Sequence, residues 1–181
     1  MNILFGIVAV LIVVVVLYYN KFVTIAHRAE EAWSDIDVQL KRRYDLIPNL
    51  VNAVKGYASH EQDTFDKVTQ ARAEAMKAST TGEHALKEAN LSAMIGNLMA
   101  VAEAYPELKA NENFSQLQTE LSDTENKIQA SRRFYNNQVL TFNNKLEVFP
   151  TNIIGGMFGF KVEEFFNIEN DKERENVEVK F

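Results

Sequence analysis

The sequence predicts an all-α membrane protein, in which an N-terminal transmembrane helix continues into an antiparallel up-down bundle of about four helices, two long and two shorter. Three observations predict this fold class. An uncharged apolar run opens the chain, two long apolar stripes with helical spacing follow, and two shorter helical patterns lie between the stripes. We divide the 181 residues into an anchor (1–20), a helical bundle (21–148), a Phe/Gly-rich membrane-proximal segment (149–166) and a charged C-terminal tail (167–181).

The predicted anchor occupies residues 3–19, which include no charged side chain. As a helix these 17 residues rise roughly 25 Å, near the lower limit for a membrane span. The run ends in a tyrosine pair that suits a headgroup layer. A cleaved signal peptide is the alternative, but it requires a basic first segment and a small-residue cleavage site. The anchor side chains are Ile3, Leu4, Phe5, Ile7, Val8, Val10, Leu11, Ile12, Val13, Val14, Val15, Val16, Leu17, Tyr18 and Tyr19.

Basic residues follow the predicted span and none precedes it. Lys21 and Arg28 lie close behind it, and the positive-inside rule then places the soluble part in the cytoplasm, beneath the cell membrane. The chain has no cysteine, which excludes lipoprotein processing, disulfides, thiolate metal sites and a cysteine nucleophile.

Two long helices are predicted over residues 22–58 and 114–149, where apolar or small residues recur in steps of four and three. Pro150 stops the second helix. In the first helix an extra four-residue step, from Leu40 to Tyr44, relaxes coiled-coil supercoiling locally. Pro48 removes a backbone donor one turn later, so we expect a kink there.

Two shorter helices are predicted between the long ones. The first opens on a capping-box pattern at 59–62 and ends before a turn at 79–82, and the second ends before Pro106. The long helices, of about 36 residues, span roughly 54 Å, and the shorter ones, of about 20, span roughly 30 Å. Up-down-up-down packing therefore brings the end of the last helix back towards the bilayer.

The segment 149–166 is unusually rich in phenylalanine. It holds five of the twelve in the chain, Phe149, Phe158, Phe160, Phe165 and Phe166. They either fold back and cap the open end of the bundle beside Phe22 or dip into the membrane interface. Alternating Val177, Val179 and Phe181 predict a short extended end to the tail.

Polar residues border both long stripes. Arg43 and Arg132 need carboxylate or carbonyl partners if they are buried, and Asp45 and Glu125 are among the acids on the same helices. We interpret them as pairs that set helix register inside the bundle or between subunits, with snorkelling at the surface as the alternative. Asn136 and Asn143 are seven residues apart and share a helical face. They predict a polar contact that fixes helix pairing, or else an exposed flank.

Two blocks of residues resemble the LemA family. The first block is Ala32-Trp33, 36–40, Arg42-Arg43, 45–51 and 54–57, and the second is 132–136, Val139, Asn143, 149–151, Gly159-Phe160 and Phe165-Phe166. The resemblance covers essentially the whole chain. It implies a bacterial or archaeal single-pass membrane protein with a soluble bundle of long helices. It implies no reaction, although some members are linked to shaping or organising internal membranes.

Known chemistry finds little support in the sequence. Paired Glu-x-x-His motifs for a bundle metal site, a nucleophile elbow and a phosphate loop are absent. The net charge of −6 argues against nucleic acid. We therefore predict a non-enzymatic structural protein without cofactor or metal, which self-assembles as a homo-oligomer and organises or remodels the lipid bilayer. The alternatives are a membrane-tethered adaptor for an unknown partner protein and, remotely, an enzyme with an unrecognised site.

Overall fold

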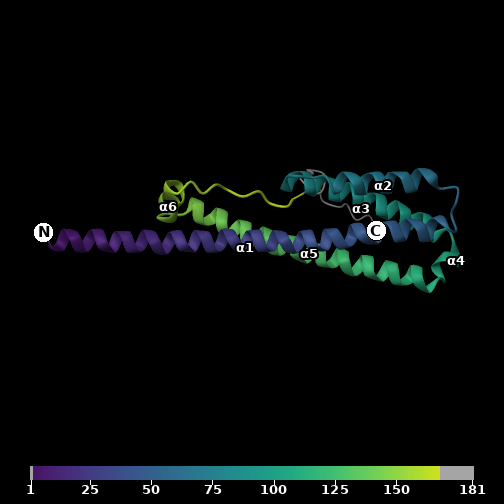
Figure 1. Ribbon diagram of the computed structural model, residues 1–181, viewed down its shortest axis with the longest axis horizontal. Helices are drawn as coiled ribbons and strands as arrows, with labels where there is room; N and C mark the ends of the chain where they lie inside the picture. The colour runs from purple at the N-terminus through teal and green to yellow at the C-terminus, as the bar shows by residue number, and fades with distance from the viewer. Residues whose placement is uncertain (1, 168–181) are drawn as a thin grey trace, which may run out of the picture.

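The computed structural model describes residues 2–167, and every regular element in this range is a helix (Figure 1). The predicted all-α fold is confirmed for this part of the chain. The extended end predicted at 177–181 and all of the tail except Asn167 lie outside the described residues. The helices are α1 (Asn2–Lys55), α2 (Gln62–Ala75), α3 (Thr81–Glu103), α4 (Pro106–Lys109), α5 (Glu112–Glu147) and α6 (Thr151–Met157).

The anchor and the first bundle helix form one helix, α1, of 54 residues. Pro48 lies inside it, and the helix continues beyond this residue to Lys55. At 1.5 Å per residue, α1 is about 80 Å long. Because no loop separates the apolar run from the bundle, the two parts share one axis.

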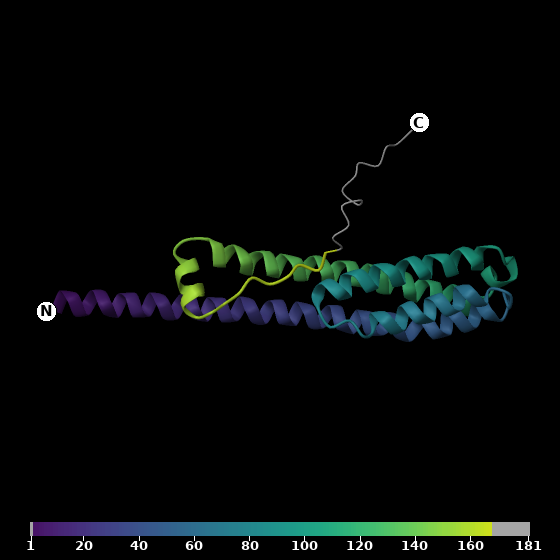
Figure 2. The same cartoon turned by 90° about the horizontal axis from the view of Figure 1, so that it is seen from above.

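The bundle has the predicted up-down-up-down order. α1 runs away from the N-terminus, α2 returns part of the way, α3 runs outward again, and α5 returns along α1 (Figure 1 and Figure 2). The short α4 lies at the far turn, between α3 and α5, and begins with Pro106 at its first turn. α6 follows α5 at the opposite end, where the N-terminal part of α1 extends beyond the bundle.

Side-chain caps fix the start of two helices. At α3 the Thr80 hydroxyl accepts a hydrogen bond from the Glu83 amide, and the Glu83 carboxylate accepts one from the Ser79 amide. At α5 the side chain of Asn111 accepts from the Phe114 amide. α2 begins at Gln62, where the capping-box pattern predicted a start, but its cap residue forms no side-chain hydrogen bond. The predicted capping box is therefore wrong, and a capping arrangement occurs at α3 instead.

The apolar stripes form the core. Ile36, Leu40, Ile47, Leu50 and Val54 of α1 are buried against α2, α3 and α5. Each fully buried aliphatic side chain stabilises the fold by about 1.5–3 kcal/mol relative to its exposed state. A second, smaller cluster joins the end of α5 and α6 to α1 near the apolar run. This second cluster positions the residues of the candidate site.

Candidate functional site

The N-terminal part of α1 is exposed along the predicted anchor. Its most apolar stretch has no buried residue, and α1 is the one helix of the described residues that is long and apolar enough to cross a membrane. Only Val15 and Tyr18 of the anchor side chains are partly covered by the rest of the protein. In water this surface would be a large apolar patch, and such patches mark membrane or protein contacts.

The second cluster holds α6 beside the last turn of this apolar run. Phe22, Phe142 and Ile154 are its buried centre, and Val15 and Tyr18 pack against it from the anchor itself. The ring of Phe22 contacts that of Phe142 edge to face, with centroids 6.1 Å apart. α6 is therefore packed at the level where the apolar run ends.

Two further features fix α6. The Thr151 hydroxyl lies 2.6 Å from the Lys145 carbonyl and 2.7 Å from the Val148 carbonyl, so it ties the start of α6 to the end of α5. Gly155 lies so close to its neighbours that an added Cβ would be 2.6 Å from a Leu146 methyl carbon and 3.3 Å from the Phe22 ring. A glycine here permits the close approach of α6 to α1 and α5.

Apolar side chains of this end also point outward. Phe149 is 75 % exposed and Phe158 is 48 % exposed. Ile153 and Met157 of α6 are exposed as well. The ring of Phe158 lies against Tyr19, with centroids 4.6 Å apart. We call Phe149, Ile153, Met157 and Phe158, together with the exposed anchor, the membrane-end surface.

The other phenylalanines of the segment are covered to a greater degree. Phe160 stacks on Phe22 at a centroid distance of 5.0 Å. Phe166 is 1 % exposed and packs against Trp33, at 5.7 Å between ring centroids. Phe165 remains partly exposed beside it. The five residues therefore divide: Phe160 and Phe166 pack against the bundle, whereas Phe149 and Phe158 remain on the surface and Phe165 is partly exposed.

Beyond α6 the chain is extended and runs back along α5 (the yellow trace in Figure 2). Asn143 makes two hydrogen bonds of 2.9 Å with the main chain of Glu163, donating to its carbonyl and accepting from its amide. Asn136 makes the same pair with Phe166, at 3.2 and 2.8 Å. We call this pair of contacts the asparagine clamp.

The distance between Asn136 and Asn143 along α5 matches the distance between their partners along the extended segment. Seven residues of helix rise about 10.5 Å, and three residues of extended chain span about 10 Å, so both asparagines face main-chain groups in register. Between them the Tyr135 hydroxyl donates to the Glu164 carbonyl at 2.9 Å. Burial raises the pKa of Tyr135, which keeps this donor protonated. The shared face of Asn136 and Asn143 thus holds a segment, not a helix.

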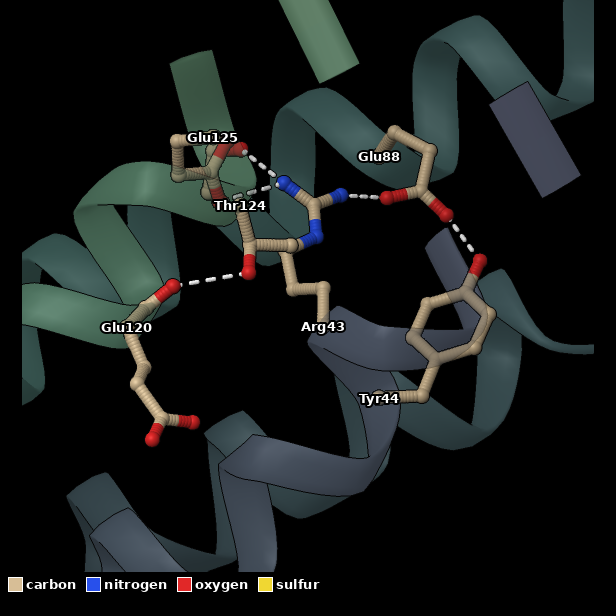
Figure 3. A network of polar contacts seen from close by, with 7 residues as sticks. Arg43, Tyr44, Glu88, Glu120, Thr124 and Glu125 are labelled. Carbon is tan, nitrogen blue, oxygen red and sulfur yellow. Dashed lines mark hydrogen bonds and ion pairs between the residues drawn. The ribbon is translucent and has the colours of Figure 1, made fainter. Parts of the chain in front are cut away.

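Arg43 lies at the centre of a buried polar network in the bundle (Figure 3). The side chain is 1 % exposed. One guanidinium nitrogen pairs with Glu88 of α3, and the other donates to Glu125 of α5 at 2.7 Å and to Ser92 at 3.1 Å. The Tyr44 hydroxyl donates to the second oxygen of Glu88. The network joins three helices through charged hydrogen bonds.

The network explains the electrostatics of this region. Burial raises the pKa of Tyr44, against an opposing effect of the Arg43 charge. Asp45 does not take part, because it is exposed and pairs with Lys41 at 3.3 Å. Arg43 and Glu88 are both sealed from solvent, and the network connects α1, α3 and α5 through them.

Sequence reasoning missed Glu88, although a signal exists for it. Glu88 lies three residues after Ala85 and three before Leu91, which are both buried, and so it occupies the apolar stripe of α3. Arg132 is half-buried, and its guanidinium carbon lies 4.6 Å from the centre of the Phe166 ring, a cation–π contact. Arg132 therefore supports the segment held by the clamp.

Known proteins resemble this chain over most of its length. The family model described as "LemA family" matches residues 32–181. "Magnetosome protein MamQ 1" of Paramagnetospirillum magneticum is 26 % identical over 185 residues, covering 88 % of this chain and 68 % of the relative. "Magnetosome protein MamQ" of Magnetospirillum gryphiswaldense is 26 % identical over 175 residues, covering 82 % and 64 %. "Protein LemA" of Metamycoplasma hominis is 31 % identical over 137 residues, covering 75 % and 62 %.

The chain spans about two thirds of the length of these curated relatives. Neither the family description nor the names of the relatives include a reaction. The matched region includes both the Arg43 network and the asparagine clamp. With its exposed apolar helix and its helical bundle, the chain belongs to the LemA family and is a membrane-associated helical protein.

Proposed function

We propose that this chain is a membrane-anchored, non-enzymatic structural protein that self-associates and organises or remodels the bilayer. The membrane-end surface carries the proposal. It combines the exposed apolar run of α1 with Phe149 and Phe158, which lie at the point where α1 would leave the membrane. Anchoring alone requires no second apolar surface, whereas a protein that bends or orders lipid can do so by inserting apolar side chains into the membrane interface beside its span.

The shape of the bundle supports lateral association. α1 and α5 extend along each other well beyond the α2–α3 hairpin, so part of this helix pair has no covering helix (Figure 2). Val38 on α1, and Phe134 and Leu140 on α5, are exposed apolar side chains of the two long helices. Anchoring places all copies at one height above the bilayer, which raises the effective concentration of matching faces.

The distribution of charge supports a cytoplasmic orientation of the bundle. Lys21 and Arg28 are exposed just beyond the span, and the positive-inside rule favours a cytoplasmic bundle. A single cysteine at exposed Glu107, in a chain without native cysteine, tests this orientation. We expect no labelling of intact cells by an impermeant maleimide and full labelling after lysis. Labelling of intact cells would place the bundle outside.

Two measurements test the proposed function. Light scattering of the full chain in detergent should give a particle of several subunits, and a monomer would refute self-association. A chain lacking residues 3–19 should still bind liposomes through α6 and its neighbours. Serine at Phe149 and Phe158 should abolish this binding, whereas serine at Leu86 and Phe134, which are exposed elsewhere, should preserve it. Equal binding by both double variants would refute the role of the membrane-end surface.

An adaptor is the second candidate function, and one observation favours it. Leu86 of α3 and Phe165 of the extended segment line a cleft of about 560 Å³ on the side of the bundle, and both are exposed apolar residues. A partner protein could dock there. A stoichiometric partner that is captured by the wild-type chain and lost with Leu86→Ser would favour recruitment over self-assembly.

A further inference from the structure

A second cleft lies between α1 and α5 near the membrane end. It has a volume of about 380 Å³. Its residues come from one face of each helix, since Lys21, Ile25 and Arg28 on α1, and Gln138, Thr141 and Lys145 on α5, are separated by three, four or seven residues.

The charge of this cleft opposes that of the protein. The whole chain has 25 acidic and 19 basic residues, yet the cleft brings three cations together and, within the described part of the chain, no lining residue is acidic. The ion pairs of the described residues use other cations, such as Lys41, Arg42 and Arg43. Among residues 2–167, no carboxylate forms an ion pair with Lys21, Arg28 or Lys145.

The position of the cleft matches the depth of lipid headgroups. Lys21 follows Tyr19, the last residue of the apolar run, by two positions, which is a rise of about 3 Å. The polar headgroup layer on each side of a bilayer is roughly 5–8 Å thick. Lys145 faces the same cleft from the end of α5, and Arg28 lies two turns above Lys21. Cations thus begin within the headgroup layer and continue just above it.

We infer that this cleft binds the phosphate of an anionic lipid headgroup. The inference rests on the proposed anchoring of α1 in the bilayer and extends it to lipid selection. Lysine ammonium groups attract phosphate as point charges, and the Arg28 guanidinium offers a planar pair of donors. The side-chain amide of Gln138 adds a neutral donor, and buried Ile25 provides an apolar wall. Basic pockets between helices at the cytoplasmic side of membranes bind such headgroups.

The full chain in neutral detergent provides the test. Native mass spectrometry would compare retention of phosphatidylglycerol with that of phosphatidylcholine after addition of both lipids. We expect at least tenfold preferential retention of phosphatidylglycerol. The triple variant Lys21→Gln, Arg28→Gln, Lys145→Gln should lose about 100-fold in affinity, since each cation contributes roughly fivefold. The control variant replaces three exposed lysines elsewhere, Lys55, Lys77 and Lys109, by glutamine and should retain the preference.

Three results would overturn the inference. The first is equal retention of both lipids by the wild-type chain, and the second is equal loss in the triple and control variants. The third is displacement of bound lipid by millimolar inorganic phosphate, which would assign the cleft to a soluble phosphate. Particle size, measured on the same samples, separates the two proposals, because unchanged multi-subunit particles without lipid preference would refute only the lipid site.

Discussion

Replacing Arg43 by methionine tests whether the buried network holds the bundle together. Methionine retains much of the arginine volume, so the change removes the charge without opening a large cavity. It leaves Glu88 buried at 4 % exposure without its cation. Glu125 is partly exposed and can recover water contacts. The cost therefore falls mainly on Glu88.

The expected magnitude follows from the burial of the pair. Removing one partner of a buried ion pair costs about 3–5 kcal/mol. For a domain of this size, each kcal/mol lowers the melting temperature by about 2–4 °C. The Arg43→Met variant should therefore melt about 6–20 °C below the wild-type chain, as followed by circular dichroism in detergent.

A neighbouring arginine provides the matched control. Arg42 is 41 % exposed and pairs with Asp123 at 3.5 Å, so Arg42→Met should cost about 0–1 kcal/mol. Combining Arg43→Met with Glu88→Leu removes both buried charges and should recover most of the lost stability. Melting temperatures for Arg43→Met and Arg42→Met that agree with each other would show that burial does not decide the strength of these pairs, and would refute the reasoning.

Three further predictions concern other parts of the structure. Tyr44→Phe should cost about 1–3 kcal/mol at neutral pH. Burial raises the pKa of Tyr44 above its usual 10.0, so Tyr44 ionises first in the unfolded chain. The free energy of unfolding of the wild-type chain should therefore fall as the pH rises above about 10. In chemical unfolding across that range, the free energy of unfolding of the phenylalanine variant should fall less. Gly155→Ala should displace α6 at a cost of about 1–3 kcal/mol and make it susceptible to protease. Gly156→Ala is the control and should leave α6 protected, because its Cβ would meet nothing within 4 Å. Equal cleavage of the two variants would contradict the close packing of α6. Alanine at both Asn136 and Asn143 should release the extended segment and so expose Trp33, which packs against Phe166; a red shift in tryptophan fluorescence would report this. Unchanged emission would show that the packing of Phe166 holds the segment without the two asparagines.

The helices could be predicted because their signals are local. The stripes of α1 and α5 repeat over many turns, and their lengths alone determine which ends meet. α4 and α6 were not predicted, since one or two turns carry too little periodicity to be recognised. The capping box was assigned to the wrong helix for a similar reason. A capping motif of four residues occurs by chance, and only the surrounding backbone decides whether its side chains reach an amide.

Site residues were harder to predict because their partners are distant. The position of Arg43 on an apolar stripe indicated a need for carboxylates, and Glu125 on α5 was among the candidates. Glu88 was missed, because an isolated glutamate in a helix looks like a solvated one until the stripe of α3 is traced. The spacing of Asn136 and Asn143 showed a shared face, but their partner is the main chain of an extended segment. Main-chain groups have no sequence signature.

Because α1 is continuous, the predicted anchor and the first bundle helix would move together as one rod. In the proposed anchoring, the same continuous helix, α1 (Asn2–Lys55), both crosses the membrane and runs the length of the bundle, so a tilt of the span would be transmitted to the far end. Membrane helices tilt by about 20° on average, and over the roughly 50 Å of α1 outside the bilayer this angle displaces the α4 end sideways by about 17 Å. A change in local bilayer thickness, which a membrane helix accommodates in part by tilting, would thereby change how far apart the distal ends of neighbouring molecules stand.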